Sequence, residues 1–206
     1  MKIIIVIFLS SFATICFSQS TEIVPELYIP DSTDIFFSSH NDLLKSTKQK
    51  DLKYGTDSIE IRLWKSTLWS VNEMYVLQNR NNQWSSYLIR YGTVIKTRRY
   101  FGVKISKKEV DFLAKIELEP IESWNKIDSI LSSCKVFEIR DQSKLDNARD
   151  FNIDDGITYT IEAASKNEYR FITWTNPKHS PKKYWDSEAV IRLSEMLKNE
   201  LKEKNL

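Results

Sequence analysis

The segment 154–177, DDGITYTIEAASKNEYRFITWTNP, most constrains the fold because it has the pattern of a β-hairpin. The dipeptide Asp155-Gly156 predicts a turn, since glycine accepts positive φ and aspartate hydrogen-bonds its own backbone. Apolar and polar residues then alternate, with the apolar ones at Ile157, Tyr159, Ile161 and Ala163. A period of two is typical of a half-buried strand. Asn176-Pro177 ends the returning strand because proline cannot donate to a sheet.

The register of this hairpin can be predicted from the face that its aromatic residues would share. If those of the second strand join the apolar face of the first, Ile161 opposes Phe171 and Ser165-Lys166-Asn167 forms the loop. The asparagine of this loop tolerates the left-handed conformation that three-residue loops require. The same register places Glu162 opposite Arg170, an ion pair that contributes roughly 0.2 to 1 kcal/mol. We expect both charges to be structural.

Upstream of the hairpin, the sequence predicts an antiparallel meander. Strands are expected at 59–64, 69–77, 83–91 and 93–101, separated by a turn at 78–82 and by a turn or bulge at Gly92. Consecutive strands with short connections favour antiparallel pairing. The segment 102–120 carries a capping box at Ser106 and Glu109 but also alternates like a strand, so helix and strand are both open there.

Two amphipathic helices complete the predicted fold. Their apolar stripes are Trp124, Ile127, Leu131 and Cys134 in the first, and Val190, Leu193, Leu197 and Leu201 in the second. Asp186 or Ser187 would cap the second helix, and 136–139 would form a short strand. We therefore predict an α+β fold in which an antiparallel β-sheet, built from the meander and the C-terminal-half hairpin, packs against two helices.

The chain begins with the pattern of a secretory signal peptide. Residues 1–18 carry one lysine and then an apolar run too short for a membrane span, which predicts cleavage after Ser18. Residues 19–57 are mostly polar and form an expected N-terminal arm, and 58–206 an expected single domain. The mature protein would be exported, periplasmic or secreted, and not an integral membrane protein.

Charge and cysteine content restrict the partners. The chain has 30 Lys and Arg against 28 Asp and Glu, so loss of Lys2 with the signal leaves a balance near neutral. A near-neutral protein has no overall field to attract nucleic acid, and none is expected as a partner. Cys16 also leaves with the signal. Cys134 is then the single cysteine, so no internal disulfide forms, and we expect a buried core thiol.

The common catalytic motifs are absent from the sequence. His40 and His179 are its two histidines, too few for a histidine-built zinc site. A Cys134–His179 dyad is disfavoured because a helix C-terminus opposes a thiolate. The chain has only 4 glycines and contains no G-x-S-x-G, phosphate-binding loop, dinucleotide fingerprint or H-E-x-x-H motif. We predict no catalytic residues and no cofactor other than the calcium discussed next.

Asp150, Asn152 and Asp154 are spaced like the first ligands of a calcium loop, with Glu162 as a later acid. Calcium loops of this type need glycine directly after the third ligand, but Asp155 stands there. An ordinary acidic turn explains the same residues. The calcium site is therefore the weaker of the two interpretations.

Two groups of residues could contact a ligand. Trp64 and Trp174 share strand faces with charged neighbours and could stack on sugar rings, although strand tryptophans are more often core anchors. Lys96, Arg98 and Tyr100 share one strand face within 90–108, a stretch with seven basic and no acidic residues. Interleaved cations and aromatics can bind a polyanion, but a solvated sheet face explains the same residues and is the favoured interpretation.

The meander, the Trp124 helix and the pattern DG-x-x-Y-x-I-E running to Trp174-Thr175-Asn176-Pro177 resemble uncharacterised exported proteins of Gram-negative bacteria. The resemblance covers roughly 59–177 and implies neither an activity nor site residues. We expect a non-catalytic exported binding or interaction module of the cell envelope, with an envelope glycan or protein as partner. The alternatives are a hydrolase that cleaves envelope or extracellular polymer with carboxylates alone, and a calcium-stabilised structural domain.

Overall fold

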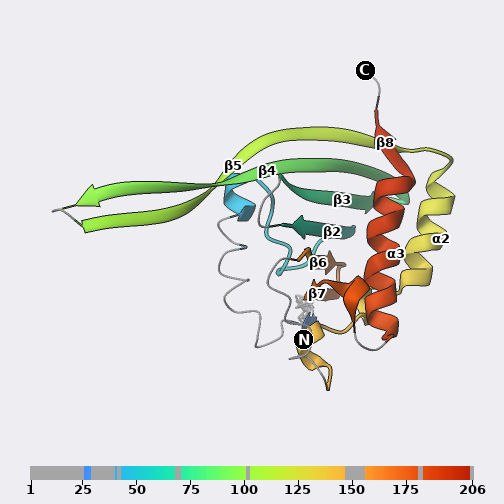
Figure 1. Ribbon diagram of the computed structural model, residues 1–206. Coiled ribbons are helices and arrows are strands. Elements are labelled where there is room, and N and C mark those ends of the chain that lie inside the picture. Colours follow the sequence, from blue (N-terminus) through green and yellow to red (C-terminus); the bar gives the residue numbers. More distant parts are fainter. Residues whose placement is uncertain are drawn as a thin grey trace, which may run out of the picture.

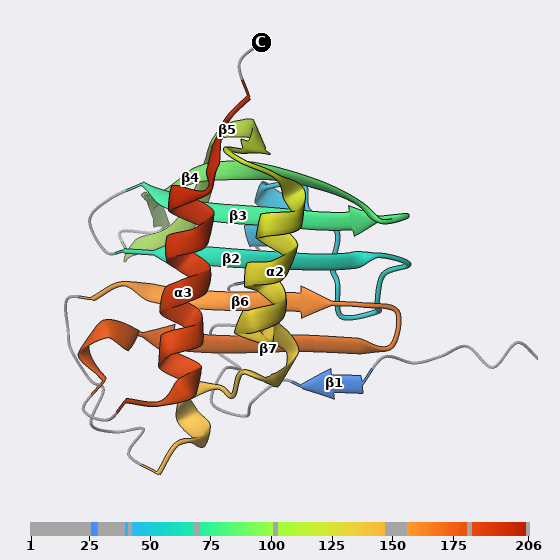
Figure 2. The same ribbon diagram turned by 90° about the vertical axis from the view of Figure 1, so that its right-hand side faces the viewer.

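The computed structural model describes residues 26–28, 40, 43–67, 71–100, 103–146, 156–180 and 183–204, with the backbone only at 26–28, 93–100 and 103–110. The described part is built on one eight-stranded sheet. Two helices, α2 (Trp124–Cys134) and α3 (Trp185–Asn199), lie side by side over one face of that sheet (Figures 1 and 2). None of the helices described is long and apolar enough to cross a membrane.

The sheet is mostly antiparallel, with spatial order β1-β7-β6-β2-β3-β4-β5-β8. Only β1 runs parallel to its neighbour, β7, among the pairs described. The strands are β1 (Glu26–Tyr28), β2 (Ile59–Ser66), β3 (Asn72–Arg80), β4 (Gln83–Tyr100), β5 (Val103–Pro120), β6 (Thr158–Ala164), β7 (Glu168–Thr175) and β8 (Leu201–Glu203). The predicted α+β class with an antiparallel sheet is confirmed.

Strands β2 to β5 pair in sequence order, as a meander requires. Asn81 and Asn82 both have positive φ, 52° and 61°, which matches the tight turn that joins two twisted strands. Of the two alternatives at Gly92, the turn is wrong, because β4 continues through this residue, and the structure has a β-bulge close by, between Arg90 and Tyr91. The segment 103–120 is a strand throughout its length, so the helical alternative for it was wrong.

The β6–β7 hairpin forms in a register one residue away from the predicted one. Ile161 opposes Ile172, and Glu162 opposes Phe171 instead of Arg170. The turn is tight because the Ser165 amide donates to the Glu168 carbonyl over 2.8 Å. The prediction assumed one apolar face, but this hairpin is buried on both faces.

Helix α2 buries Ile127, Leu131 and Cys134 as expected, and its cap is Ser123, whose side chain accepts from the Lys126 amide. Helix α3 begins at Trp185, so Asp186 lies inside its first turn and does not cap it. The predicted strand at 136–139 is instead a short 3₁₀ helix, η2 (Val136–Glu138). Other 3₁₀ turns are η3 (Gln142–Lys144) and η5 (Pro177–His179).

The larger core lies between the helices and the sheet, with members such as Leu63, Ile172, Trp174, Leu193 and Leu197. The opposite sheet face carries two smaller clusters, one around Trp64, Met74, Val76 and Ile89 and the other around Tyr169 and Phe171. Leu44 and Leu52, from the segment expected to be a polar arm, complete these clusters. The sheet is therefore buried on both faces, and 43–52 packs as part of the domain.

Candidate functional site

The structure excludes the two tryptophans that were predicted to stack on sugars. Trp64 is 2 % exposed and Trp174 is 0 % exposed, so neither presents an indole face to a ligand. Trp64 packs on the sheet face opposite the helices, where its ring meets His40 edge to face at 4.9 Å between centroids. Trp174 lies under the helices, and its Nε1 donates to the Arg140 carbonyl over 2.9 Å. Both are core anchors.

Of the predicted calcium ligands, Asp150, Asn152 and Asp154 lie outside the described residues. Glu162 is fully buried and contacts an arginine, which excludes it as an accessible calcium ligand. In the described part of the chain, no three His, Cys, Asp or Glu side chains gather closely enough to hold a metal ion.

The most organised group of ionisable side chains is a buried cluster around Arg62 on the sheet face opposite the helices. Arg62 Nη1 donates to Glu162 Oε2 over 2.9 Å, and its Nε donates to Glu60 Oε1 over 2.7 Å. Sheet register produces these contacts, because Arg62 directly opposes Glu162 across β2 and β6. Gln78, which opposes Glu60 across β2 and β3, donates to Glu60 Oε2 over 2.7 Å.

Two further side chains complete the cluster at Glu162. The Tyr169 hydroxyl donates to Oε1 over 3.1 Å, and His40 Nε2 lies 3.4 Å from the same oxygen. Burial alone would raise the pKa of Glu162, but the contact with His40 and the charge of Arg62 outweigh it and lower that pKa. Burial likewise opposes the charge of Arg62, but both carboxylates raise its pKa above the usual value. Arg62 and Glu162 are therefore both charged at neutral pH.

This cluster is buried and paired internally, and it is not arranged for chemistry. Each of the four carboxylate oxygens of Glu60 and Glu162 has a partner within the cluster. A carboxylate that is buried and neutralised in this way cannot reach a substrate or exchange a proton with it. The sequence offered one sign of this arrangement: Trp64 shares the strand face of Glu60 and Arg62, which is unusual for a solvated face.

Lys96, Arg98 and Tyr100 lie on a two-stranded ribbon that projects from the sheet. β3 begins at Asn72, opposite Tyr91, and β8 pairs only with 118–120 of β5. From 93–100 and 103–110, β4 and β5 therefore pair only with each other among the described strands. Figure 1 shows this ribbon extending well beyond the rest of the sheet.

The ribbon carries a concentrated positive charge. Within 93–110 the basic residues are Lys96, Arg98, Arg99, Lys104, Lys107 and Lys108, and Glu109 is the single acid. Six of the 30 basic residues and one of the 28 acidic ones lie there, which leaves 24 basic against 27 acidic residues elsewhere. The near-neutral net charge of the whole chain is therefore the sum of a positively charged ribbon and a net negative charge over the remaining residues.

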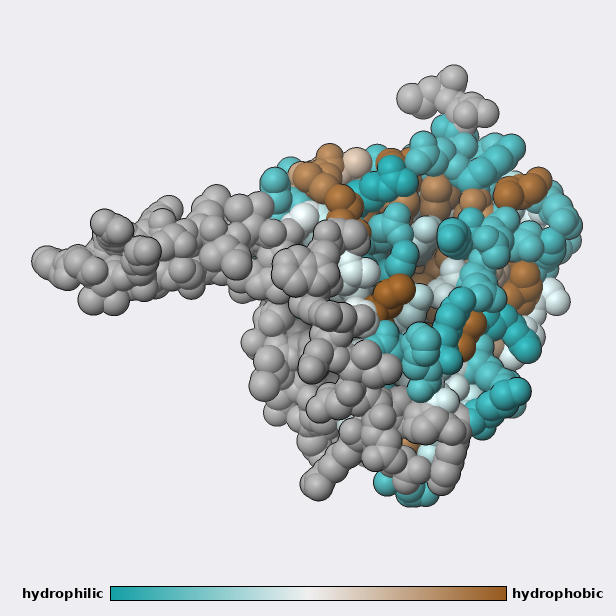
Figure 3. Space-filling view, in the orientation of Figure 1, coloured by the Kyte–Doolittle hydropathy of each residue, from teal (hydrophilic) through white to brown (hydrophobic). Residues whose placement is uncertain are grey.

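Exposed apolar side chains gather where the ribbon leaves the sheet. Val71, Phe112 and Leu113 are all exposed, although they are large and apolar. Figure 3 shows hydrophobic surface beside the base of the ribbon. Exposed apolar groups next to concentrated charge are typical of an interaction surface.

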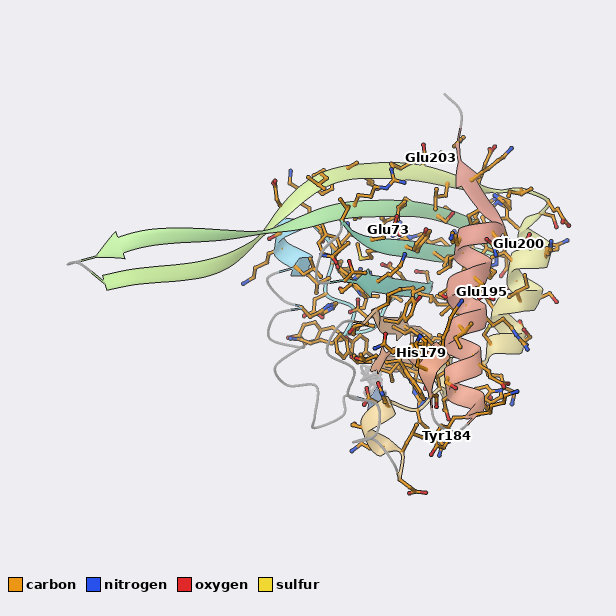
Figure 4. All side chains as sticks on the ribbon, viewed as in Figure 1. Glu73, His179, Tyr184, Glu195, Glu200 and Glu203 are labelled. Atoms are coloured by element: carbon orange, nitrogen blue, oxygen red, sulfur yellow. The ribbon has the colours of Figure 1, made fainter. Side chains whose placement is uncertain are left out.

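A groove of about 500 Å³ runs between α2 and α3 and is lined by Ile130, Ile191 and Met196 together with charged residues. Glu195 and Glu200, labelled in Figure 4, lie along it. Glu195 is paired with Lys178 at 2.9 Å and Glu200 with Lys126 at 2.7 Å. These ion pairs satisfy the two carboxylates within the protein, and none of the described residues that line the groove is aromatic, so it is a weak candidate for a ligand site.

Cys134 and His179 do not form a nucleophilic pair. Cys134 is buried at the end of α2, and this burial raises the pKa of its thiol. His179 is exposed in η5 and is labelled in Figure 4. A buried neutral thiol is inert, as expected of a core residue.

Comparison of the chain with protein-family models, with curated proteins and with solved structures gave no match. The resemblance to exported proteins of Gram-negative bacteria therefore stays a prediction. The function has to be argued from the geometry of this molecule.

Proposed function

We propose that this protein is a non-catalytic binding module of the cell envelope, and that its β4–β5 ribbon contacts an anionic envelope polymer. Export to the envelope rests on the signal peptide predicted at 1–18. The ribbon supplies the contact, and the sheet with its two covered faces supplies a rigid base for it.

The pairing of like charges across the ribbon carries the proposal. Lys96 directly opposes Lys107, and Arg99 directly opposes Lys104. Like charges in opposing positions destabilise a strand pair, and an isolated two-stranded ribbon is marginal even without them. An anionic polymer lying along the ribbon would remove this repulsion and gain attraction from every cation. The ribbon is thus better suited to a bound state than to an isolated one.

The arrangement of the carboxylates favours binding over hydrolysis. A glycosidase of the carboxylate type needs two acids facing a substrate at about 5 to 10 Å from each other. Glu60 and Glu162, which meet at Arg62, are buried and neutralised there. Glu73 and Glu203, which meet at Arg90, are paired with its guanidinium at 3.8 and 3.6 Å. This arrangement supports a non-catalytic binding module over a carboxylate-based hydrolase.

The proposal can be tested with dextran sulfate, a polyanion, and neutral dextran, which shares its backbone. The purified protein should bind the first and not the second. Each cation that contacts the polymer releases a counterion, which gives a slope of about 0.7 to 0.9 per contact when log K is plotted against log salt, as for nucleic acids. Replacing Lys96, Lys104 and Lys107 with glutamine should therefore reduce the slope by about 2 to 3.

Lys166, Lys198 and Lys204 provide the matched control, since all three are exposed and lie outside the ribbon. Their replacement by glutamine removes the same charge and should leave the slope almost unchanged. Equal losses in the two triple variants would show that net charge alone drives binding, and the ribbon would lose its assigned role. Absence of binding to dextran sulfate at low salt would refute the proposal.

A further inference from the structure

A second surface feature, independent of the ribbon, lies where the loop after α2 meets the start of α3. A pocket of about 420 Å³ is lined there by Lys135, Glu138, Arg140, Trp185 and Asp186. Tyr184, labelled in Figure 4, immediately precedes α3 and marks its position. Pockets of this size hold small ligands or single units of a polymer.

Trp185 differs from the buried tryptophans of the sheet. It is 43 % exposed, whereas Trp64 and Trp174 are almost completely buried. An indole has a large apolar face and gains by covering it, so an exposed one in a pocket is suited to stack on a ligand. Its exposure makes Trp185 suited to stack on a sugar ring, which is what the sequence had predicted for Trp64 and Trp174.

Arg140 stands in the same pocket and is held in place before any ligand arrives. Its Nη2 donates to Asp186 Oδ2 over 2.7 Å, and its backbone amide donates to Asp186 Oδ1 over 2.7 Å. Trp174 Nε1 fixes its carbonyl from the other side. The Arg140 side chain nevertheless stays 57 % exposed, while Asp186 is buried. A cation ordered in advance loses little conformational entropy when it binds an anion.

The remaining wall of the pocket supplies both a donor and an acceptor. Lys135 Nζ pairs with Glu138 Oε2 at 3.0 Å, and both side chains are largely exposed. Such a pair can exchange hydrogen bonds with neighbouring hydroxyl groups. The pocket therefore combines a stacking surface, a fixed cation for a carboxylate and groups for hydroxyls.

We infer that this pocket binds an acidic saccharide unit, a sugar ring that carries a carboxylate. The apolar face of the ring stacks on Trp185, and its carboxylate accepts hydrogen bonds from Arg140. Lys135 and Glu138 bind hydroxyl groups at the opposite edge. This inference does not depend on the ribbon, and the two sites would bind separately.

Calorimetric titration of the purified protein with trigalacturonate and with its methyl ester tests the inference. The two trisaccharides share the same sugar backbone, and the ester replaces each charged carboxylate by a neutral group that carries one additional methyl. We expect trigalacturonate to bind and the ester to bind at least about tenfold more weakly, since the ester cannot form the charge-assisted pair with Arg140. Equal affinities would overturn the role of Arg140, and absence of binding at millimolar concentration would overturn the site.

Trp185→Ala should weaken trigalacturonate binding by about tenfold. Tyr54→Ala is the matched control, because Tyr54 is an exposed aromatic with a cation, Lys53, 4.8 Å from its ring centre and is not among the residues that line the pocket. It should bind like the wild type, as should the ribbon variant. An unchanged affinity in Trp185→Ala, with its fold confirmed by circular dichroism, or an equal loss in Tyr54→Ala, would refute the inference.

Discussion

Replacing Arg62 with methionine should destabilise the fold strongly, because it leaves two buried carboxylates without their cation. Arg62 is 1 % exposed and Glu162 is 0 % exposed, so water cannot replace the lost guanidinium. Breaking a buried charge pair by removing one partner costs about 3 to 5 kcal/mol. For a chain of this size each kcal/mol lowers Tm by about 2 to 4 °C, so we expect a fall of roughly 6 to 20 °C.

The effect should depend on pH in a defined direction. In the wild type the lowered pKa of Glu162 contributes stability above the ordinary glutamate pKa, and this stability is lost as pH falls through the folded value. In Arg62→Met, burial without the charge of the guanidinium raises the pKa of Glu162, so the variant gains stability as this carboxylate protonates. The difference in unfolding free energy between the two proteins should therefore narrow as pH falls from 7 to about 4.5.

Urea denaturation of both proteins at several pH values measures this difference. Lys65→Met is a suitable control on the same strand, because Lys65 forms a partly exposed pair with Glu73 at 3.6 Å, and such pairs contribute at most about 1 kcal/mol. Adding Glu60→Gln and Glu162→Gln to Arg62→Met should recover part of the loss. If Arg62→Met stays within about 1 kcal/mol of the wild type, or if the difference is independent of pH, the buried cluster is not the stabilising element that we describe.

Most strand and helix identities could be predicted from the sequence, because local periodicity determines them; the exceptions are 102–120, where helix and strand both stayed open, and 136–139, predicted as a strand but found as η2. Ile127, Leu131 and Cys134 mark one face of α2, and the asparagines before β4 mark a tight turn. Pairing register could not be predicted so well. The predicted pairing of Ile161 with Phe171 required a hairpin with a single apolar face. A hairpin buried on both faces is compatible with two pairing registers that differ by one residue.

The buried cluster escaped prediction for a related reason. Glu60 and Arg62 alternate with apolar residues as they would on a strand with one face in water. The same periodicity results when the charged face is buried against charged side chains of a neighbouring strand, so the two cases cannot be distinguished from the sequence. Glu162 is 100 residues away from Arg62 in the chain, so their contact depends on β2 pairing with β6. The pocket at Trp185 likewise depends on where η2 meets α3. Composition had indicated a basic stretch, but only the topology shows that it projects.

Three smaller predictions follow from the described contacts. A thiol reagent should label Cys134 only after unfolding, because the thiol is buried and has a raised pKa; rapid labelling of the folded protein at neutral pH would contradict this. Asn82→Val should lower the urea midpoint by the equivalent of about 1 to 2 kcal/mol, whereas Asn82→Gly should be nearly neutral, because this position has a φ of 61°. Gly156→Ala would place its Cβ 1.9 Å from Asn176 Nδ2 and displace the Asn176 side chain, which accepts a hydrogen bond from the Ile157 amide. Thermal melting should therefore show that the free energy of unfolding falls by about 1 kcal/mol or more. An unchanged Tm would mean that the Asn176 side chain moves away without cost.

Hydrogen exchange with and without dextran sulfate tests the role of the ribbon most directly. The ribbon amides at 93–100 and 103–110 pair across only one interface among the described strands, so in the free protein they should exchange faster than those of the central strands β2 and β3. If the ribbon binds an anionic polymer, the polymer should slow exchange in these two segments and leave β6 and β7 unchanged. Protection confined to other parts of the protein, or none at a polymer concentration that saturates binding, would contradict the proposed function.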